Sequence, residues 1–309
     1  MRAVFRALLC VIVLGAGLSP AWAQRADGSA EHPLRVLLIP ADGGTEDGTK
    51  ADFLPLFNAI TRSTGLHFEV VTGHSYGAVI EGMCSGLADI AWFGAASYIE
   101  ARDRGCAELL AMEVKNGQSQ YYAGIFVQAS SEIQTLEDLR GHSLAVGSVH
   151  STSSFIYPVA MVMEAGLDPV GDLSSIRITD SHANALRALQ AGVVDAGAAS
   201  LDSYVRAVNQ GAIGVEDLRI LARSAPIPTP PLALHPDLPA EMKASLRTAL
   251  RDVHTAPGVT PEMIRGYGGK RVDRYDVDVS DEIIDTAAGR LSQVEGEVTN
   301  AIVRAASRR

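Results

Sequence analysis

Short apolar runs alternate with amphipathic segments along most of this chain. The first run, Leu34 to Ile39, ends at Pro40, and a helical pattern follows from about Asp52 to Thr64 with Leu54, Leu56, Phe57 and Ile60 on one face. A second strand is predicted at His67 to Val71. Strands that alternate with helices form parallel sheets, so this pattern predicts an α/β fold.

One α/β block occurs twice, with copies that begin at Tyr76 and His182. In both copies a glycine, an aspartate and a tyrosine follow the start at identical offsets: Gly86, Asp89 and Tyr98, then Gly192, Asp195 and Tyr204. In both copies the glycine ends a helix. In the first copy a short strand at 90–93 follows the aspartate, and after a loop at 94–97 the next helix is expected at Tyr98. In the second copy the segment 193–196 leads a strand, and the next helix is expected at 203–204. Two such copies predict two lobes with a ligand between them, at the amino ends of the helices.

Extended segments predict how the two lobes are joined. Residues 121–127 lead into the second lobe, residues 218–222 and the rigid, proline-rich stretch 226–231 lead back, and 232–234 rejoins the first sheet. Helical patterns follow at about 240–253 and from 280 to the C-terminus. The predicted division is a signal peptide at 1–23, a first lobe at 32–123 plus 229–305, and a second lobe at 124–228.

The turn from Gly147 to Phe155 is the strongest chemical signal in the chain. It follows the apolar run 143–146, contains Ser151, Thr152, Ser153 and Ser154 in a row, and opens a helical pattern. A helix start offers free backbone N–H groups and a dipole that favours negative charge, so hydroxyl donors at this point indicate a small oxyanion site. The alternative is that one residue is an N-cap and the others fill a turn.

The N-terminus predicts export. Arg2 and Arg6 precede an apolar run at 7–18, and Ala21-Trp22-Ala23 is typical of a cleavage site, so cleavage is expected after Ala23. The apolar run is too short to span a bilayer, and no lipid-accepting cysteine stands at the cleavage site. We therefore expect a periplasmic protein without a membrane anchor.

Charge and cysteine content exclude several classes of partner. The chain has 26 basic and 36 acidic residues, and loss of Arg2 and Arg6 gives a mature net charge of 24 − 36 = −12. An acidic surface without a Lys/Arg cluster argues against nucleic acid and anionic membranes. Cleavage leaves Cys84 and Cys106, and no His/Cys cluster has the spacing of a metal site, so neither a metal nor another cofactor is predicted.

In combination, four stretches resemble the periplasmic phosphonate-, phosphite- and phosphate-binding proteins of ABC transporters. They are Tyr76 to Met83, Ala88 to Gly94, Ser151 to Phe155 with Pro158, and His182 with Asn184 to Leu186. The resemblance covers about residues 34–269. It implies the two-lobed periplasmic binding protein fold of type II-like topology, with two crossover strands, a ligand cleft and an ABC permease as partner. The ligand contacts implied are Tyr76, Tyr121, Ser151, Thr152, Ser153 and His182. His182 can donate from either ring nitrogen and would bind an anion more strongly if protonated.

Three positions depart from the family, and two of them indicate a smaller ligand. Asp202 stands where the family has a glutamate, and it either selects protonated or amine-bearing ligands or simply suits the first turn of a helix. Pro230 aligns with an aspartate that meets the ammonium of 2-aminoethylphosphonate in a binder of that ligand, and Tyr122 replaces a tryptophan beside the cleft. We therefore expect phosphite, phosphate, methylphosphonate or a similar tetrahedral oxyanion.

Two other classes of function compete with uptake. Ser151 or Ser153 with His182 and Asp202 supplies the groups of a hydrolase, but no G-x-S-x-G elbow surrounds either serine, so no enzyme is predicted. Some relatives of this family present arsenite to a sensor kinase, apparently through a cysteine, and Cys106 makes that alternative possible here. Cys84 and Cys106 each follow a helix that starts at the cleft, so both should lie on the far side of the lobe, where a disulfide is expected.

Overall fold

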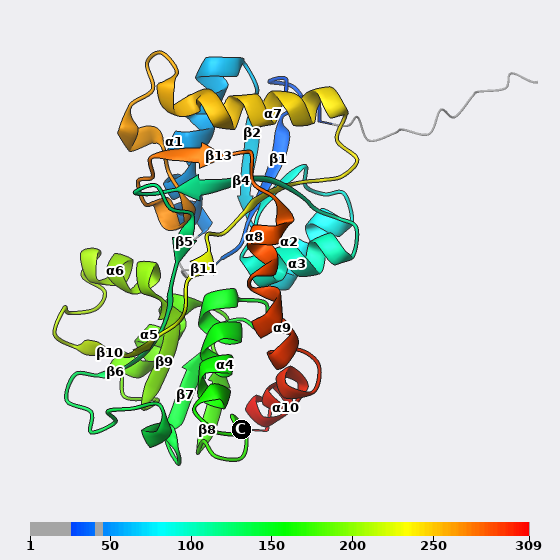
Figure 1. Ribbon diagram of the computed structural model, residues 1–309. Helices are drawn as coiled ribbons and strands as arrows, with labels where there is room; N and C mark the ends of the chain where they lie inside the picture. Colours follow the sequence, from blue (N-terminus) through cyan, green and yellow to red (C-terminus); the bar gives the residue numbers. More distant parts are fainter. Residues whose placement is uncertain (1–25, 41–45, 309) are drawn as a thin grey trace, which may run out of the picture.

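The computed structural model describes residues 26–40 and 46–308 and shows two lobes, each built around its own sheet (Figure 1). This architecture confirms the predicted α/β fold with two lobes. The predicted signal peptide at 1–23, with its cleavage site after Ala23, lies outside the described residues. In the part of the chain that is described, no helix has the length and apolar character needed to cross a membrane.

The first lobe contains a six-stranded sheet in the order β13-β4-β12-β3-β1-β2. Its strands are β1 (Leu34–Leu38), β2 (Phe68–Thr72), β3 (Ile90–Trp92), β4 (Glu108–Val114), β12 (Leu232–Leu234) and β13 (Arg274–Asp276). Strand β1 is parallel to β2 and β3, whereas β12 is antiparallel to both of its neighbours. The return of the chain into this sheet at 232–234 was predicted, but β4 and β13 were missed.

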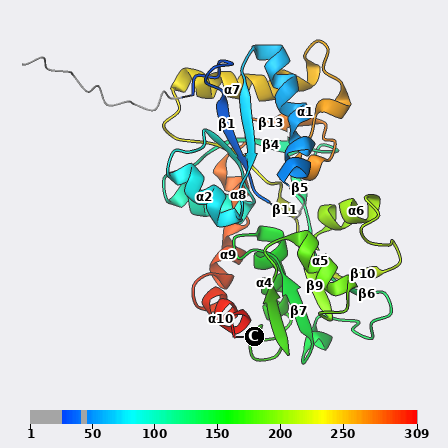
Figure 2. The same ribbon diagram turned by 180° about the vertical axis from the view of Figure 1, so that it is seen from behind.

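Helices cover both faces of the first sheet (Figure 2). Helices α1 (Glu46–Thr64) and α7 (Ala240–Asp252) lie on one face, and α2 (Tyr76–Cys84) and α3 (Ala95–Asp103) lie on the other. The rings of Phe53 and Trp92 pack edge to face with centroids 4.5 Å apart between α1 and the sheet. The connections of this lobe include three short 3₁₀ segments: η3 (Val253–Thr255), η4 (Pro261–Met263) and η5 (Tyr267–Gly269).

The second lobe contains a five-stranded sheet in the order β10-β6-β9-β7-β8. Its strands are β6 (Ala123–Gln128), β7 (Ser143–Val146), β8 (Ser175–Ile178), β9 (Ala196–Ser200) and β10 (Leu218–Arg223). Helices α5 (His182–Gln190) and α6 (Leu201–Asn209) pack near one face. The other face carries α4 (Tyr157–Glu164), which continues from the π-helical turn η2 (Thr152–Ile156), and η1 (Glu137–Leu139) lies in the loop before β7.

Two antiparallel strands cross between the lobes (Figure 1). They are β5 (Gln120–Tyr121) and β11 (Ile227–Pro228), and Tyr121 lies opposite Ile227. The two predicted crossings are therefore confirmed, and they pair with each other between the lobes.

The repeated block has the same structure in both copies. Helices α2 and α5 each have a serine N-cap, Ser75 or Ser181, whose side chain accepts a backbone N–H from the first turn. The aspartate after each helix then holds the start of the neighbouring parallel strand. Asp89 accepts the N–H of Arg35 at 2.8 Å, and Asp195 accepts the N–H of Ser143 at 2.8 Å. The two copies consequently aim equivalent helix starts at the space between the lobes.

Three predicted helix starts are wrong. Helix α1 begins at Glu46 instead of Asp52, in a stretch without apolar periodicity. Helix α3 begins at Ala95, so the predicted loop 94–97 is mostly helical; Gly94 is its N-cap, and the Gly94 N–H donates to Ser97 Oγ at 3.0 Å. Helix α6 begins at Leu201 instead of 203–204, because Ser200 is its N-cap and accepts the Ser203 N–H.

The C-terminal helices differ from the predicted division of the chain, which assigned 229–305 to the first lobe. Helix α8 (Asp281–Asp285) lies beside α3, but α9 (Ala288–Val294) packs against α4, and α10 (Glu297–Ala306) lies against β8 of the second lobe (Figure 1). Arg290 of α9 pairs with Glu164 of α4 at 2.8 Å. The apolar side chains of this segment are buried in a cluster that includes side chains of α4 as well as of α2 and α3, so the segment packs on both lobes.

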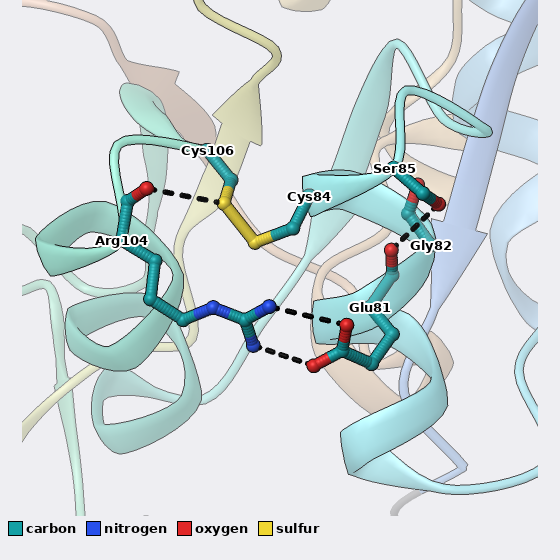
Figure 3. Close-up of a disulfide and its surroundings, with 6 residues drawn as sticks. All are labelled: Glu81, Gly82, Cys84, Ser85, Arg104 and Cys106. Carbon is teal, nitrogen blue, oxygen red and sulfur yellow. Dashed lines mark hydrogen bonds and ion pairs between the residues drawn. A yellow bond between two sulfur atoms is a disulfide. The ribbon is translucent and has the colours of Figure 1, made fainter.

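Cys84 and Cys106 form a disulfide (Figure 3). Their Cα atoms are 4.7 Å apart, and the bond joins the end of α2 to the segment after α3. Glu81 and Arg104 form a two-pronged ion pair next to it, with the shorter contact at 2.6 Å. Both cysteines lie at the ends of helices whose opposite ends face the second lobe.

Candidate functional site

Five helical N-termini meet at a pocket of about 380 Å³ between the lobes. The first lobe contributes the starts of α2 and α3, and the second contributes those of η2, α5 and α6. A residue at each start lines the pocket: Tyr76, Gly94, Ser151, His182 and Ser200. Free N–H groups and helix dipoles of both lobes thus point at one space, which favours an anion there.

All seven residues predicted to bind the ligand line this pocket. They are Tyr76, Tyr121, Ser151, Thr152, Ser153, His182 and Asp202. The structure brings them together from both lobes and from the first crossover strand, and their part in binding stays a prediction.

The Ser151 turn combines capping with donors that capping does not use. Ser151 Oγ is the N-cap acceptor for the Ser154 N–H at 3.2 Å, and it also accepts the Ser154 hydroxyl at 2.7 Å. Thr152 and Ser153 are buried and make other contacts. Only glycine fits at Gly147, since a Cβ there would stand 2.1 Å from Ser154 Oγ. The N-cap interpretation therefore holds for Ser151, and the neighbouring hydroxyls remain donors at the pocket wall.

His182 is held in one tautomer by the backbone. The Ser200 N–H donates to Nδ1 at 2.9 Å, so Nδ1 is an acceptor and the ring proton is on Nε2. Nε2 lies 3.4 Å from Ser151 Oγ at the pocket wall, and the side chain is only 2% exposed. A proton on Nδ1 would face the Ser200 N–H, so this geometry favours a neutral imidazole that donates from Nε2. The protonated ring that the sequence suggested as a stronger anion ligand is disfavoured.

The two tyrosines add phenolic donors from the first lobe and the crossover strand. Tyr76 is buried at the first position of α2. Burial raises the pKa of Tyr121, although a hydrogen bond with Ser153 acts in the opposite direction. The Tyr121 phenol therefore stays protonated and can donate. Tyr122 does not line the pocket; the guanidinium of Arg223 lies 3.4 Å from the centre of its ring.

Asp202 has a partner that the sequence did not indicate. Lys270 Nζ lies 2.5 Å from Asp202 Oδ2 and 2.6 Å from Glu113 Oε1. Lys270 and Glu113 belong to the first lobe, whereas Asp202 lies in the first turn of α6, so this ion pair spans the cleft. Burial would lower the pKa of Lys270, but the two carboxylates more than offset it and the pKa is raised. Asp202 is consequently paired with an ammonium that the first lobe holds in its charged form.

Arg206, one turn after Asp202 on α6, forms a second bridge to the first lobe. Its Nη1 donates to the carbonyl of Gly268 at 2.7 Å, and its Nη2 pairs with Asp52 of α1. Asp52, Arg206 and Gly268 all line the pocket. Two ion pairs therefore hold α6 against the first lobe. Helix α6 supplies the carboxylate of one pair and the guanidinium of the other.

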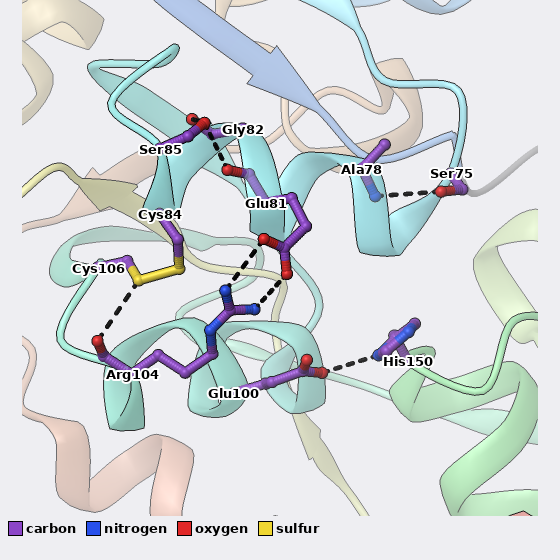
Figure 4. Close-up of polar contacts among 10 residues, drawn as sticks. All are labelled: Ser75, Ala78, Glu81, Gly82, Cys84, Ser85, Glu100, Arg104, Cys106 and His150. Atoms are coloured by element: carbon purple, nitrogen blue, oxygen red, sulfur yellow. Dashed lines mark hydrogen bonds and ion pairs between the residues drawn. A yellow bond between two sulfur atoms is a disulfide. The ribbon is translucent and has the colours of Figure 1, made fainter.

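Two further contacts join the lobes on the other side of the pocket. The Ala96 N–H of α3 donates to Thr152 Oγ1 at 2.9 Å. Glu100 of α3 pairs with His150 Nδ1 at 2.7 Å, just before the Ser151 turn (Figure 4). A Cβ at Gly94 would stand 3.2 Å from Thr152 Oγ1, so glycine permits this close approach. The structure thus has both lobes closed on the pocket.

Sequence reasoning missed the bridging residues Asp52, Glu113, Arg206 and Lys270, together with Gly94 and Ser200. A signal existed for the last two. Gly94 follows Tyr76 at the same offset as Ser200 follows His182, so the repeated block places both at equivalent helix starts. The four charged residues had no such signal, because their pairing depends on tertiary contacts.

The arrangement does not support a catalytic triad. A triad requires a carboxylate that orients the histidine through Nδ1, and here Nδ1 accepts a backbone N–H from Ser200. Asp202 is paired with Lys270 instead. Ser151 already accepts two hydrogen bonds as a cap. These groups suit the holding of an anion better than nucleophilic attack.

Comparison with known proteins gives a consistent family match. Residues 44–276 match the family described as "ABC transporter, phosphonate, periplasmic substrate-binding protein". The Phosphate-import protein PhnD of Mycolicibacterium smegmatis is 29% identical over 203 residues, which cover 62% of this chain and 63% of that protein. The chain therefore aligns with slightly less than two thirds of that relative's length.

A second relative and a solved structure extend the match. The Phosphonates-binding periplasmic protein of Escherichia coli K12 is 24% identical over 250 residues, covering 79% of this chain and 71% of the relative. A crystal structure of a binding protein component of an ABC phosphonate transporter from Pseudomonas aeruginosa superposes with a TM-score of 0.72 at 22% identity, covering 89% of this chain and 99% of the other. That structural likeness concerns the fold.

Proposed function

The chain belongs to the family of periplasmic substrate-binding proteins of phosphonate ABC transporters, and we propose that it captures a small tetrahedral oxyanion and delivers it to an ABC permease. The ligand class is phosphite, phosphate or a small phosphonate. One observation carries the proposal: helical N-termini of both lobes converge on one pocket, whose wall carries neutral hydroxyl, phenol and imidazole donors together with basic side chains. The family match supports it, since such proteins bind substrates and do not transform them.

The proposed binding site divides the ligand's oxygens between the two lobes. Ser151, Thr152 and Ser153 provide hydroxyl and backbone donors from the second lobe, and His182 donates from Nε2. Tyr76 donates from the first lobe and Tyr121 from the crossover strand. Neutral donors and helix dipoles allow a chain with an acidic net charge to bind an anion, because they act locally at the pocket.

The proposed mechanism is closure of the lobes around the ligand. Open lobes would each present only part of the donor set, so the ligand binds the closed state better and shifts the population toward it. The closed form is then the state that a permease recognises. On the same reasoning we propose that the protein has no catalytic activity, and that export follows cleavage after Ala23, which N-terminal sequencing of the mature protein would test.

The alternative of an arsenite sensor requires an available thiol. Cys106 forms a disulfide with Cys84 at helix ends that lie away from the pocket, so no observation favours that alternative.

Thermal denaturation and titration calorimetry of the mature protein test the proposal. Phosphite, phosphate, methylphosphonate, sulfate and arsenite are compared, because a ligand that binds the folded state raises its melting temperature. We expect a shift with one or more of the phosphorus oxyanions and its loss in Ser151→Ala and His182→Ala. A response to arsenite alone, or to none of the phosphorus oxyanions, would contradict the proposed ligand class.

A further inference from the structure

The pocket is lined by two carboxylates, and both are already paired with a basic side chain across the cleft. Asp52 of the first lobe pairs with Arg206 of the second, and Asp202 of the second lobe pairs with Lys270 of the first. The remaining charged residue at the pocket wall is the cation Lys115. Within the described lining, no carboxylate is therefore left to meet a positively charged group on a ligand.

Lys270 is built into the first lobe and is not a flexible surface residue. Glu113, whose side chain is 1% exposed, holds Lys270 Nζ with one oxygen and accepts the Tyr267 N–H with the other at 2.6 Å. The Lys270 side chain is only 18% exposed, while Asp202 is 47% exposed. The ammonium is consequently fixed by its own lobe before closure, and α6 brings Asp202 to it.

We propose that Lys270 is a specificity-determining residue that excludes ligands with an ammonium-bearing arm. An ammonium that reached Asp202 from the pocket would stand beside the ammonium of Lys270 and be repelled by it, and it would compete for the same carboxylate. Ligands with an uncharged substituent, or with none, meet no such repulsion. This assignment rests on the proposed function, because it concerns which tetrahedral oxyanions the same pocket accepts.

The consequence is that the carboxylate alone does not define ligand preference. Asp202 read from the sequence favours an amine-bearing ligand, whereas the Asp202–Lys270 pair reverses that preference. Removal of the Lys270 ammonium should restore it, because Asp202 then becomes an unpaired anion at the pocket wall.

Calorimetry with methylphosphonate and 2-aminoethylphosphonate, which differ in the ammonium-bearing arm, tests this on three variants. Lys270→Met removes the ammonium, and Glu113→Gln/Lys270→Met does so without leaving a buried unpaired carboxylate, so that one variant folds even if the other does not. Lys243→Met is the matched control: Lys243 pairs with Glu108 at 2.6 Å, is 17% exposed and does not line the pocket.

The wild-type protein should bind methylphosphonate more tightly than 2-aminoethylphosphonate. Loss of the Lys270 ammonium should improve the affinity for 2-aminoethylphosphonate relative to methylphosphonate by about tenfold. Lys243→Met should leave that ratio unchanged. An unchanged ratio in both folded Lys270 variants, or a wild-type preference for 2-aminoethylphosphonate, would overturn the assignment. Failure of the wild-type protein to bind any phosphorus oxyanion would instead refute the proposed function.

Discussion

The disulfide between Cys84 and Cys106 gives a prediction whose size follows from the chain. Replacing both residues in Cys84→Ser/Cys106→Ser removes a crosslink between positions separated by 22 residues. In the chain-entropy description, a loop of this length stabilises the folded state by about 3 kcal/mol, because it restricts the unfolded chain. In a protein of this size, that loss lowers the melting temperature by about 6 to 12 °C.

Ligand affinity should change little in the same variant. The disulfide joins the C-terminal end of α2 to the segment after α3, whereas the N-termini of both helices face the pocket and are fixed by their own caps. Ser75 accepts the Ala78 N–H at 3.1 Å (Figure 4). Ser97 accepts the Gly94 N–H at 3.0 Å. The variant therefore separates stability from binding.

Thermal denaturation without ligand and calorimetry with the preferred oxyanion measure the two effects. Glu81→Gln is the control, since it removes the exposed ion pair beside the disulfide and should barely move the melting temperature. A shift below about 2 °C in the double variant would refute the entropic reasoning. Loss of binding in it would refute the assignment of the cysteines to structure and would favour a sensor role.

Three other substitutions test the closed state and the repeated block. Thr152→Val leaves the buried Ala96 N–H without its acceptor and should weaken binding by about 5- to 150-fold in calorimetry, whereas Thr152→Ser should preserve it. Arg206→Met breaks the bridge to Asp52 and should raise the ligand dissociation rate by about tenfold in stopped-flow measurements, without such an effect in Arg104→Met. Partial burial acts to raise the pKa of Asp195, but the hydrogen bonds from Ser143 lower it overall, so its stabilisation is present above its ordinary value of 3.8 and is lost as pH falls through the folded value. Melting curves should therefore show Asp195→Asn less stable than wild type at neutral pH, with the difference shrinking as the pH falls below about 4.

The sequence predicted those parts of the fold that depend on local signals. A serine cap, an apolar face and a terminal glycine predict helices α2 and α5, and each of these features acts within one or two turns. Strands β4 and β13 were missed because neither belongs to the repeated block that guided the prediction. The C-terminal helices were assigned to the first lobe because apolar periodicity shows that a helix is buried but not which lobe buries it.

The residues of the pocket likewise divide into those that local sequence signals predict and those that they do not. The Ser151 turn and His182 could be found because hydroxyl residues and a histidine stand at predicted helix starts. The Lys270 bridge could not, because Glu113 and Lys270 lie far apart in the chain and neither stands in a recognisable motif. The sequence indicated Asp202 as a site residue but not its pairing with Lys270, because the charge of a site depends on partners that only tertiary structure brings together.

The repeated block explains why this pocket needs both lobes. Each copy ends a parallel strand and begins two helices toward the cleft, so one lobe alone presents donors to only one side of a tetrahedral anion. The bridges at Thr152, Asp202 and Arg206 are formed between lobes and are therefore gained only on closure. Their energy adds to that of the ligand contacts in stabilising the closed state, yet none of them depends on the chemical identity of the ligand. Discrimination among oxyanions must then come from the donors at the helix starts and from the charged groups of the bridges that face the pocket. The Asp202–Lys270 pair is therefore both a contact that closes the lobes and a determinant of ligand selectivity.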